Sequence, residues 1–441
     1  MDLAGKQIAV LGAGGSGYAA AALALARGAS VSVFDSGSPE KLAAAVTRFA
    51  ALGAPLTCGA EALVPAANYD LCVISPGIDA SWPIATAFAA ASKELVGEIE
   101  FAWRLGGAPV IAITGTNGKT TTTSLIATML NAAGLRAISA GNIGLPYSEV
   151  VLSGEKYDWI VLEVSSFQLE TVSTFAPRIG VWLNFAPDHM DRYAAVEDYF
   201  NAKRQIFRNI GPTDLVVRKL ECDLSISGRT ATFSAFAPGG DLVYGSGEIV
   251  HPGTQRRFPF AKGELQGKHN AENVMAALAV ADELGISWDS VASAMLAFKA
   301  PPHRCEKVAV IDGVTYLNDS KSTNLHSLES ALQGQEAPVV LIVGGKNKGL
   351  DFSEIRPVAE RSVREAICIG EIASQIVADW AGAVSCRLAV GVDEAVALAR
   401  RIARPGEVVL FSPGTSSFDM FTGYEARGEC FRRAVAGLCP G

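Results

Sequence analysis

The stretch 115–121 has the residue types and spacing of a loop that binds phosphate. It reads Gly-Thr-Asn-Gly-Lys-Thr-Thr and lies between an apolar run at 110–113, which predicts a buried strand, and a helical apolar pattern at 125–130. Glycines allow backbone N–H groups to close on an anion, Lys119 adds a positive charge, and the Thr120 hydroxyl suits a phosphate-bound Mg²⁺. The Gly-x-x-Gly-Lys-Thr spacing is two residues shorter than the usual P-loop. A turn with an incidental lysine is the alternative, but the order of strand, loop and helix favours phosphate binding.

A second glycine pattern, Gly-Ala-Gly-Gly-Ser-Gly at 12–17, lies between a strand pattern and an alanine-rich helix pattern. The next strand pattern ends at Asp35, which completes the glycines and acid of a dinucleotide-type fingerprint. Taken alone it indicates NAD or FAD, although any nucleoside diphosphate offers the same pyrophosphate to the loop. The turn at 75–78 (Ser-Pro-Gly-Ile) follows a later strand pattern of the same sheet, at the edge where ligands of such folds bind. That turn is equally consistent with a plain β-to-α connection.

Three further candidate residues lie in the middle of the chain, at the end of a strand pattern, after one and on a helix pattern. Glu163 ends a continuous apolar run, where a carboxylate is rare, so beside a phosphate loop it favours Mg²⁺ binding over a strand-end glutamate in water. His189 follows the next strand pattern and is flanked by Asp188 and Asp191, which favours a catalytic or metal-binding role. Lys203 lies on a helix pattern and, judged from that pattern alone, is expected to be a solvated lysine.

Polar side chains also follow strand patterns in the last third of the chain. Lys321 and Lys348 lie in loops that, together with a Ser- and Thr-rich loop at 412–417, predict a site for a small anionic ligand; ordinary βα loops are the alternative. Earlier, Asn270 and Asn273 are spaced one helical turn apart on one face, where two amides could cap the helix or contact a base.

The elements that must position these residues predict an α/β fold. A chain of 441 residues exceeds what one hydrophobic core usually supports, and 49% of its residues are apolar. We expect three domains: a Rossmann-like nucleotide-binding domain at 1–96, a central P-loop ATPase-like domain at 97–299, and a second Rossmann-like α/β domain at 300–441. The central domain is expected to have a mainly parallel sheet and a small antiparallel flap at 214–260. The Asp312-Gly313 pair predicts a hairpin at the start of the third domain.

Composition excludes several partners. A net charge of −8 gives no reason to expect nucleic acid, because a backbone-binding surface needs clustered Lys and Arg. The eight cysteines are scattered, with no Cys-x-x-Cys pair, and no signal-like segment precedes the first strand pattern, so we expect reduced thiols in the cytoplasm. No apolar run reaches the roughly 18 residues of a membrane span, so no membrane association is expected.

Together these motifs resemble the Mur ligases, the ATP-dependent amino-acid-adding enzymes of peptidoglycan synthesis, over the whole chain. The resemblance rests on 115–121, Gly141–Pro146, Leu162–Glu170, Asp188–Tyr193, Ala202-Lys203, His269–Asn273, Pro302–Arg304, Asn318–Lys321 and Ser412–Gly428. The short phosphate loop is shared with folylpolyglutamate synthases, whereas Ser165–Glu170 and His189–Tyr193 are similar to the D-glutamate-adding branch. Two positions depart from the family: Gly37 stands where an arginine is common, and Gly414-Thr415 replaces a small apolar pair.

The resemblance implies a role for each matching residue. Catalytic roles are implied for Lys119, Glu163, His189 and Lys203. ATP contacts are implied for Gly115, Thr116, Asn117, Gly118, Lys119, Thr120, Thr121, Asn270, Asn273, Arg304 and Asp319. Two Mg²⁺ ions are implied, with Thr120, Glu163, His189 and a carbamylated Lys203 as ligands. The UDP-substrate site would consist of Gly14, Gly15, Ser16, Gly17, Asp35, Ser36, Ser75, Pro76, Gly77 and Asn142, and the amino-acid site of Lys321, Thr323, Lys348, Ser417, Phe418 and Tyr424.

The implied reaction is amide formation between UDP-N-acetylmuramoyl-L-alanine and D-glutamate through an acyl phosphate. Small-molecule substrates and a monomeric, cytoplasmic protein are expected. A nicotinamide-dependent oxidoreductase using the glycines at 12–17 is the rival reading, but it leaves the phosphate loop unexplained. A third reading is a P-loop regulatory or transport ATPase without ligase activity. Its ATP turnover would not depend on a UDP-sugar, which distinguishes it from a ligase. Within the family, a folate-glutamylating enzyme is a further alternative. It is disfavoured, because such an activity gives no reason for a nucleotide-type first domain.

Overall fold

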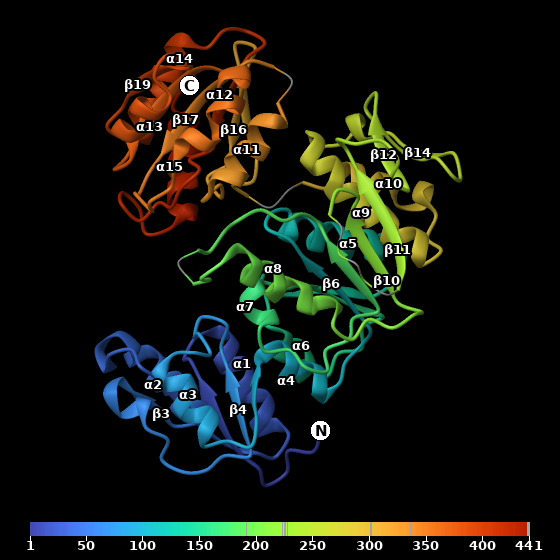
Figure 1. Cartoon of the computed structure of the whole chain (residues 1–441), viewed down its shortest axis with the longest axis vertical. Helices are drawn as coiled ribbons and strands as arrows, with labels where there is room; N and C mark the ends of the chain where they lie inside the picture. Colours follow the sequence, from blue (N-terminus) through green and yellow to red (C-terminus); the bar gives the residue numbers. More distant parts are fainter. Residues whose placement is uncertain are drawn as a thin grey trace. The chain divides into compact units, whose positions relative to one another are not determined.

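The computed structural model of the protein describes residues 1–190, 192–222, 224, 226, 228–299, 302–335 and 337–438. Within these residues the chain forms three β-sheets with helices on their faces (Figure 1). It divides into two compact units. The first comprises Met1–Val243, His251–Thr254 and Val274–Met295, and the second comprises Tyr244–Val250, Gln255–Asn273 and Leu296–Gly441.

The first sheet has five parallel strands in the order β3-β2-β1-β4-β5. Its strands are β1 (Gln7–Leu11), β2 (Ser30–Asp35), β3 (Leu56–Cys58), β4 (Leu71–Ile74) and β5 (Leu95–Gly97), and its helices are α1 (Gly15–Ala26), α2 (Pro39–Leu52) and α3 (Pro83–Ala90). The strand order reverses between β1 and β4, so the loops after Leu11 and Ile74 flank the crevice where such sheets bind ligands. This confirms the Rossmann-like expectation for the start of the chain.

The central sheet has nine strands in the order β14-β13-β12-β11-β10-β9-β6-β8-β7. The strands are β6 (Val110–Thr114), β7 (Ala137–Gly141), β8 (Trp159–Glu163), β9 (Ile179–Trp182), β10 (Leu215–Lys219), β11 (Arg229–Ser234), β12 (Leu242–Gly245), β13 (Glu248–His251) and β14 (Arg256–Phe258). The helices of this region are α4 (Glu98–Leu105), α5 (Lys119–Ala132), α6 (Tyr147–Ser153), α7 (Ser166–Leu169), α8 (Val196–Arg204), α9 (Lys268–Glu283) and α10 (Trp288–Ala297). Strand β6 pairs in parallel with β8 and β9 and is buried throughout, which explains its continuous apolar sequence.

The expected antiparallel flap is wrong for the strands β10 to β12. Strand β10 pairs in parallel with β9, β11 pairs in parallel with β10, and β12 pairs in parallel with β11, so these strands extend the central sheet. The connection between β12 and β13 is a tight turn, Ser246-Gly247, where both residues have positive φ, as in a two-residue hairpin. The connections between β10, β11 and β12 are short for parallel crossovers, which is why the sequence pattern suggested hairpins.

The third sheet has six strands in the order β15-β16-β20-β17-β18-β19. They are β15 (Glu306–Ile311), β16 (Val314–Asn318), β17 (Val339–Gly344), β18 (Val363–Ile369), β19 (Ser385–Leu388) and β20 (Val408–Phe411), with helices α11 (Leu325–Gln333), α12 (Arg356–Ser362), α13 (Ala373–Asp379), α14 (Val392–Ile402) and α15 (Tyr424–Ala436). Strands β15 and β16 form the predicted antiparallel hairpin through Asp312-Gly313. Strand β20, the last in sequence, lies between β16 and β17 and is parallel to both.

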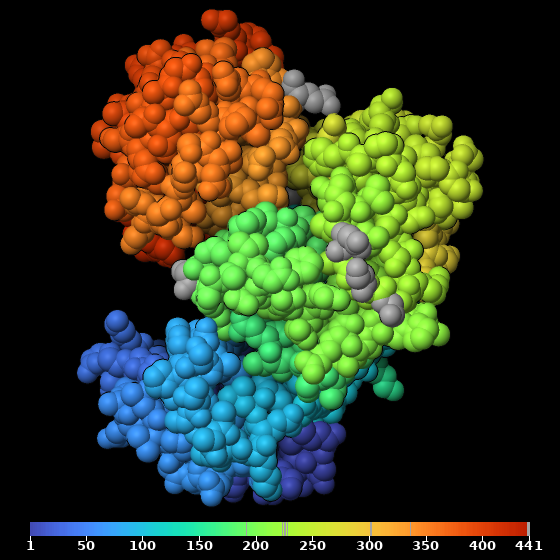
Figure 2. Space-filling view, viewed as in Figure 1, coloured from blue at the N-terminus to red at the C-terminus, as the bar shows by residue number. Residues whose placement is uncertain are grey.

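One hydrophobic core connects the first sheet with the central sheet. It includes Ile8 and Leu23 from the first sheet and its helix, and Tyr147 and Ile160 from the central sheet and helix α6. Helix α1 packs against α4 and α6. In the space-filling view the blue segment of the chain, which carries the first sheet, adjoins the teal segment that belongs to the central region (Figure 2). The two sheets therefore share one folded unit.

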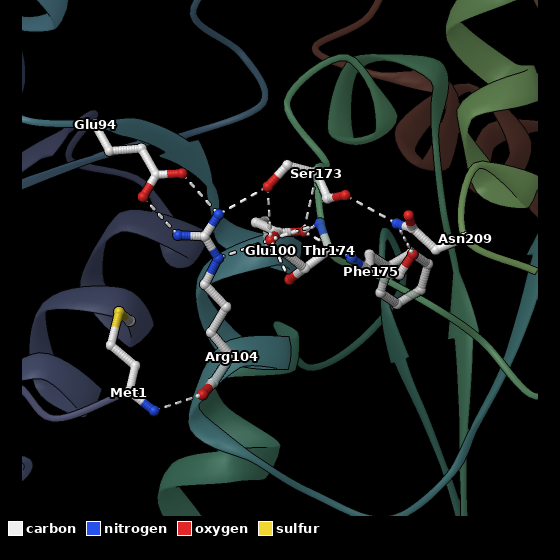
Figure 3. A network of polar contacts seen from close by, with 8 residues as sticks. All are labelled: Met1, Glu94, Glu100, Arg104, Ser173, Thr174, Phe175 and Asn209. Carbon is white, nitrogen blue, oxygen red and sulfur yellow. Dashed lines mark hydrogen bonds and ion pairs between the residues drawn. The ribbon is translucent and has the colours of Figure 1, made fainter.

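A buried polar network reinforces this joint (Figure 3). The side chain of Glu100, on α4, is fully buried and accepts hydrogen bonds from Arg104 Nε at 2.7 Å and from the backbone N–H groups of Ser173, Thr174 and Phe175 at 2.9–3.1 Å. Arg104 also forms a two-pronged ion pair with Glu94, which precedes β5, at 2.7 Å for both contacts. Helix α4 is thus fixed both to the first sheet and to the segment that leads into β9.

None of the described helices combines the length and the apolar character needed to cross a membrane.

Candidate active site

The phosphate loop lies between the carboxyl end of β6 and the start of α5. Lys119 folds back over it, and its Nζ donates hydrogen bonds to the carbonyl oxygens of Gly115 and Thr116, both at 2.9 Å. Asn184, the second residue after β9, braces the other side: its Oδ1 accepts from Asn117 N at 2.9 Å and its Nδ2 donates to Asn117 O at 3.1 Å. These contacts hold the loop in shape. Asn184 was missed from the sequence, although its place after a strand that neighbours β6 is the signal that could have found it.

Glu163 provides a carboxylate oxygen next to this loop. It ends β8, opposite Ile113 of β6, and only 3% of the residue is exposed. Its Oε1 accepts from Asn142 Nδ2 at 2.9 Å, whereas its buried Oε2 has no hydrogen-bond partner among the described residues. Buried polar atoms are nearly always paired, and an oxygen of this kind is the ligand that Mg²⁺ prefers. The Oε2 atom of Glu163 is therefore suited to bind a cation. Asn142, which was expected at the UDP substrate, instead donates to the other Glu163 oxygen.

Lys203 is not the solvated lysine that its helix pattern suggested. Only 2% of the residue is exposed, and its Nζ donates to Gly115 O of the phosphate loop at 2.9 Å. Burial, and then the charge of Lys119, lower the pKa of Lys203 well below its usual value, while Asp188 and Glu163 oppose the shift. A lowered pKa favours the neutral amine. Tyr199 and Ala202 on α8 belong to a hydrophobic cluster with Tyr193, and the Lys203 Nζ lies 4.6 Å from the centre of the Tyr199 ring.

His189 lies on the same side of the site but is half exposed. Its backbone has a positive φ of 58°, and its ring centroid lies 4.8 Å from that of Phe167 and 5.9 Å from that of Tyr199. Its Nε2 is 3.9 Å from Asp188 Oδ2. Asp191, the other flanking aspartate, lies outside the described residues. Within the described chain, no three His, Cys, Asp or Glu side chains gather closely enough to hold a metal by themselves.

The glycine turn of the first sheet meets the loop after β4. A Cβ atom on Gly17 would lie 1.9 Å from Gly12 O, and one on Gly12 would lie 2.6 Å from Ser75 Oγ, so both positions require glycine. Both carboxylate oxygens of Asp35 are engaged by backbone, accepting from Ala13 N and Gly37 N at 2.8 Å. Gly14, Gly15, Ser36 and Gly77 are exposed around this turn. The expected UDP residues of the first sheet thus surround one turn, and Asp35 shapes it.

A pocket lies between the loop after β4 and the central region. Two buried polar atoms of its lining have no hydrogen-bond partner among the described residues: Ser75 Oγ and Glu98 Oε2. Arg192 also lines the pocket, and its Nε lies 3.4 Å from Asp79 Oδ2. Glu98 and Arg192 were not among the expected site residues. Because buried polar groups are rarely left unpaired, these atoms indicate a place for water or for polar groups of a ligand.

In the second unit, Asn270 and Asn273 occupy one face of α9 as expected. Asn273 Nδ2 donates to Asn270 Oδ1 at 3.1 Å, and Asn270 Nδ2 donates to Gln266 O at 2.8 Å. Both are buried. The second contact is not a helix cap, because a cap at the start of a helix accepts from a backbone N–H, whereas Asn270 Nδ2 donates to a carbonyl. Contact of the two amides with a base stays a prediction. Arg304 and Asp319 belong to this second unit as well, whereas the phosphate loop belongs to the first.

The polar loops of the third sheet converge, because they follow the adjacent strands β16, β20 and β17. Ser412 Oγ donates to Asp319 Oδ2 at 2.8 Å, and Lys346 N donates to Ser416 O at 3.0 Å. Burial raises the pKa of Asp319 to about 6, although hydrogen bonds from Ser412 and Cys305 oppose it. Lys321 Nζ lies 3.7 Å from the centre of the Tyr424 ring.

The other expected amino-acid residues differ in exposure. Ser417 is buried and Thr323 is partly buried, whereas Lys348 and Phe418 are exposed, Phe418 by 66%. The last two present a charged and an apolar side chain to solvent at the same sheet edge.

Arg427 holds these loops together, and it was missed from the sequence. It is fully buried on α15, and its guanidinium donates to Ser320 Oγ at 3.1 Å, Ser320 O at 2.8 Å and Thr415 O at 3.0 Å. It therefore connects the loop after β16 with the loop after β20. An arginine within a helix looks like a surface residue, so only its position beside Gly428, where the helix packs closely on His303, hints at burial.

Comparisons with known proteins agree with this architecture. A family model described as the Mur ligase middle domain matches residues 113–281, and one described as the Mur ligase glutamate ligase domain matches residues 303–414. A UDP-N-acetylmuramoylalanine–D-glutamate ligase of Geobacter metallireducens is 39% identical over 450 residues, covering 100% of this chain and 99% of that protein.

Solved structures show the same fold. The UDP-N-acetylmuramate-alanine ligase of Thermotoga maritima has a TM-score of 0.60 at 18% identity, covering 98% of this chain and 100% of that one. The MurF ligase of Thermotoga maritima in complex with ADP has a TM-score of 0.61 at 15% identity, covering 93% and 96%.

Proposed function

The chain belongs to the Mur ligase family, and on that basis we propose that it is an ATP-dependent ligase that joins D-glutamate to UDP-N-acetylmuramoyl-L-alanine in peptidoglycan precursor synthesis. The names of its full-length relatives support the choice of D-glutamate. One arrangement in this chain supports the reaction class: a phosphate loop with the buried Lys203 amine and a Glu163 oxygen that has no hydrogen-bond partner in the described part of the chain.

The reaction requires two steps, because a carboxylate carbon is a poor electrophile. The acceptor carboxylate oxygen attacks the γ-phosphorus of ATP, and the bond from that phosphorus to the bridging oxygen breaks to release ADP. The amine of D-glutamate then attacks the carbonyl carbon of the acyl phosphate, and inorganic phosphate leaves as the amine loses its proton. Backbone N–H groups of the loop at 115–118 and the ammonium of Lys119 stabilise the phosphoryl charge.

Two Mg²⁺ ions would neutralise the phosphate oxygens when bound. We assign Thr120 and Glu163 to one ion, because hydroxyl and carboxylate oxygens suit a hard cation. The second is assigned to His189 and to Lys203 in its carbamylated form. The neutral Lys203 amine attacks CO₂, a C–N bond forms, and a proton leaves, so the product is an anionic oxygen ligand. Its lowered pKa supports this step, because only the neutral amine is nucleophilic.

The remaining site assignments follow the domains proposed at 1–96, 97–299 and 300–441. The glycine turn with Ser75, Pro76 and Gly77 would bind the UDP part, with Asn142 next to it. The loop at 115–121 would bind the phosphates of ATP, with Asn270 and Asn273 on the adenine side. D-glutamate would bind the loops of the third sheet, among Lys321, Thr323, Lys348, Ser417, Phe418 and Tyr424, with Arg304 and Asp319 on the ATP side. We propose a monomer that works in the cytoplasm, where ATP and the UDP precursor are available.

The test is phosphate release from the purified protein. ATP, Mg²⁺, UDP-N-acetylmuramoyl-L-alanine and D-glutamate should all be required, because the acyl phosphate forms only on a bound acceptor. A panel with L-glutamate, L-alanine and meso-diaminopimelate in place of D-glutamate tests the amino acid. Equal turnover with any of these would contradict the D-glutamate assignment, and turnover of ATP without a UDP-sugar would contradict the ligase reaction.

A further inference from the structure

Arg192 connects the loop after β4 with the central region. Its Nη1 donates to Pro76 O at 3.1 Å, and its Nε lies 3.4 Å from Asp79 Oδ2, both in that loop. On the central side its Nη2 donates to Glu170 Oε2 at 2.5 Å, and the guanidinium carbon lies 4.2 Å from the centre of the Phe167 ring. Only 13% of the side chain is exposed. The guanidinium therefore touches both sides of the pocket that it lines.

Arg192 is also connected to the phosphate loop. Its partner Glu170 accepts a hydrogen bond from Tyr193 Oη at 2.5 Å, and the rings of Tyr193 and Tyr199 lie 5.3 Å apart. Tyr199 Oη lies 3.4 Å from Thr116 Oγ1. Burial and then the Glu170 hydrogen bond raise the pKa of Tyr193, so its hydroxyl stays protonated and able to donate. A continuous set of packed and hydrogen-bonded side chains thus runs from Pro76 to Thr116.

The simpler interpretation is that the ion pairs of Arg192 only stabilise the joint between the first sheet and the central sheet. That joint, however, already has the ion pairs of Arg104. Arg104 ties Glu94 to Glu100 and to the segment before β9, without touching the loop after β4. Arg192 instead contacts the backbone of Pro76, directly after Ser75, whose buried hydroxyl has no partner among the described residues. Arg192 therefore holds the loop that carries this buried hydroxyl.

We propose that Arg192 is a positioning residue that fixes the loop at 75–79, and the UDP-linked acceptor bound there, relative to the phosphate loop. This inference rests on the proposed ligase function. Alignment of the acceptor carboxylate with the γ-phosphate is most of what such an enzyme contributes, and a misplacement of about 1 Å costs about 100-fold in rate. The flat, forked guanidinium makes contacts in several directions, which a lysine ammonium cannot reproduce.

The test compares Arg192→Ala, Arg192→Lys and the control Arg104→Lys, which weakens the same joint elsewhere. Hydrogen exchange of the backbone at 75–82 in the ligand-free protein should become faster in both Arg192 variants and stay as in wild type in the control. In Arg192→Ala, kcat/KM for UDP-N-acetylmuramoyl-L-alanine should fall about 100-fold, with a smaller loss in Arg192→Lys. The Kd of ATP and the KM of D-glutamate should stay within about threefold.

Each outcome separates the inference from the function on which it rests. Unchanged exchange at 75–82 overturns the inference whether or not the protein is a ligase. Faster exchange with an unchanged kcat/KM for the acceptor also overturns it, as does an equal loss of kcat/KM in Arg104→Lys. If wild type shows no phosphate release but Arg192 variants exchange faster at 75–82, the fixing of the loop is supported and the proposed function has failed.

Discussion

Replacing Glu100 by glutamine tests the joint between the first and central sheets. The carboxylate accepts hydrogen bonds from Arg104, from three backbone N–H groups at Ser173–Phe175, and from the Ser173 and Thr174 hydroxyls (Figure 3). Glutamine keeps the size of the side chain. It removes the negative charge opposite Arg104 and turns one acceptor oxygen into an NH₂ group that faces other donors.

The magnitude follows from the pKa of Glu100. Burial works to raise it, but hydrogen bonds from Thr174, Ser173 and Arg104 outweigh burial and hold the pKa at about 2, against the usual 4.5. At about 1.4 kcal/mol for each pKa unit, the ionised carboxylate contributes roughly 3 kcal/mol to the free energy of unfolding. Breaking a buried pair by removing one partner typically costs about 3–5 kcal/mol. We therefore expect Glu100→Gln to lower the free energy of unfolding by about 3 kcal/mol at pH 7.

Urea unfolding, followed by tryptophan fluorescence and circular dichroism, measures this loss. The folded pKa lies below the unfolded one, so the stabilisation is fully present above pH 4.5 and disappears as the pH falls from 4.5 towards 2. The difference between wild type and Glu100→Gln should shrink over the same window. The control Glu155→Gln removes an exposed ion pair with Arg136 and should cost less than about 1 kcal/mol. A loss below 1 kcal/mol at pH 7, or a difference that stays constant between pH 5 and 3, would refute the reasoning.

Three further changes test the sites. Lys203→Ala should lose most ligase activity, and formate or acetate should restore part of it by filling the place of the carbamate; near-normal activity in the variant, measured as phosphate release, would contradict the carbamate role. Gly17→Ala should abolish UDP binding in calorimetric titration because its Cβ would lie 1.9 Å from a backbone oxygen, whereas the control Gly245→Ala at the end of β12, whose Cβ meets nothing within 4 Å, should bind as wild type does. Arg427→Lys should raise the KM of D-glutamate about 10-fold or more, because an ammonium cannot span the two loops that the guanidinium joins; a KM within twofold of wild type would show that the loops hold without it.

What could be predicted from the sequence was mostly local chemistry. The phosphate loop, the glycine turn and the Asp312-Gly313 hairpin each depend on a few consecutive residues whose backbone requirements are encoded in their types. The convergence of the loops after β16, β17 and β20 was also predictable, because parallel strands with alternating helices direct their carboxyl ends to one edge of a sheet.

What could not be predicted depends on burial by distant parts of the chain. Lys203 looks like a surface lysine on its helix, but its burial beside Tyr199 and the phosphate loop, and then the charge of Lys119, lower its pKa. Arg427 is hidden in the same way, since its partners Ser320 and Thr415 lie far away in sequence. The direction of β11 was misjudged because a short connection usually joins antiparallel strands.

The position of β20 has a consequence for how the protein is made. Strands β16 and β17 are synthesised well before Val408–Phe411, yet they are not neighbours and must leave room for a strand that has not left the ribosome. Until it arrives, two strand edges stay unpaired and open to wrong partners. A nascent chain therefore cannot bring together the loops after β16, β17 and β20 until Val408–Phe411 has been synthesised. A chain that stops before Val408 should expose these strand edges and be bound by chaperones or degraded by proteases.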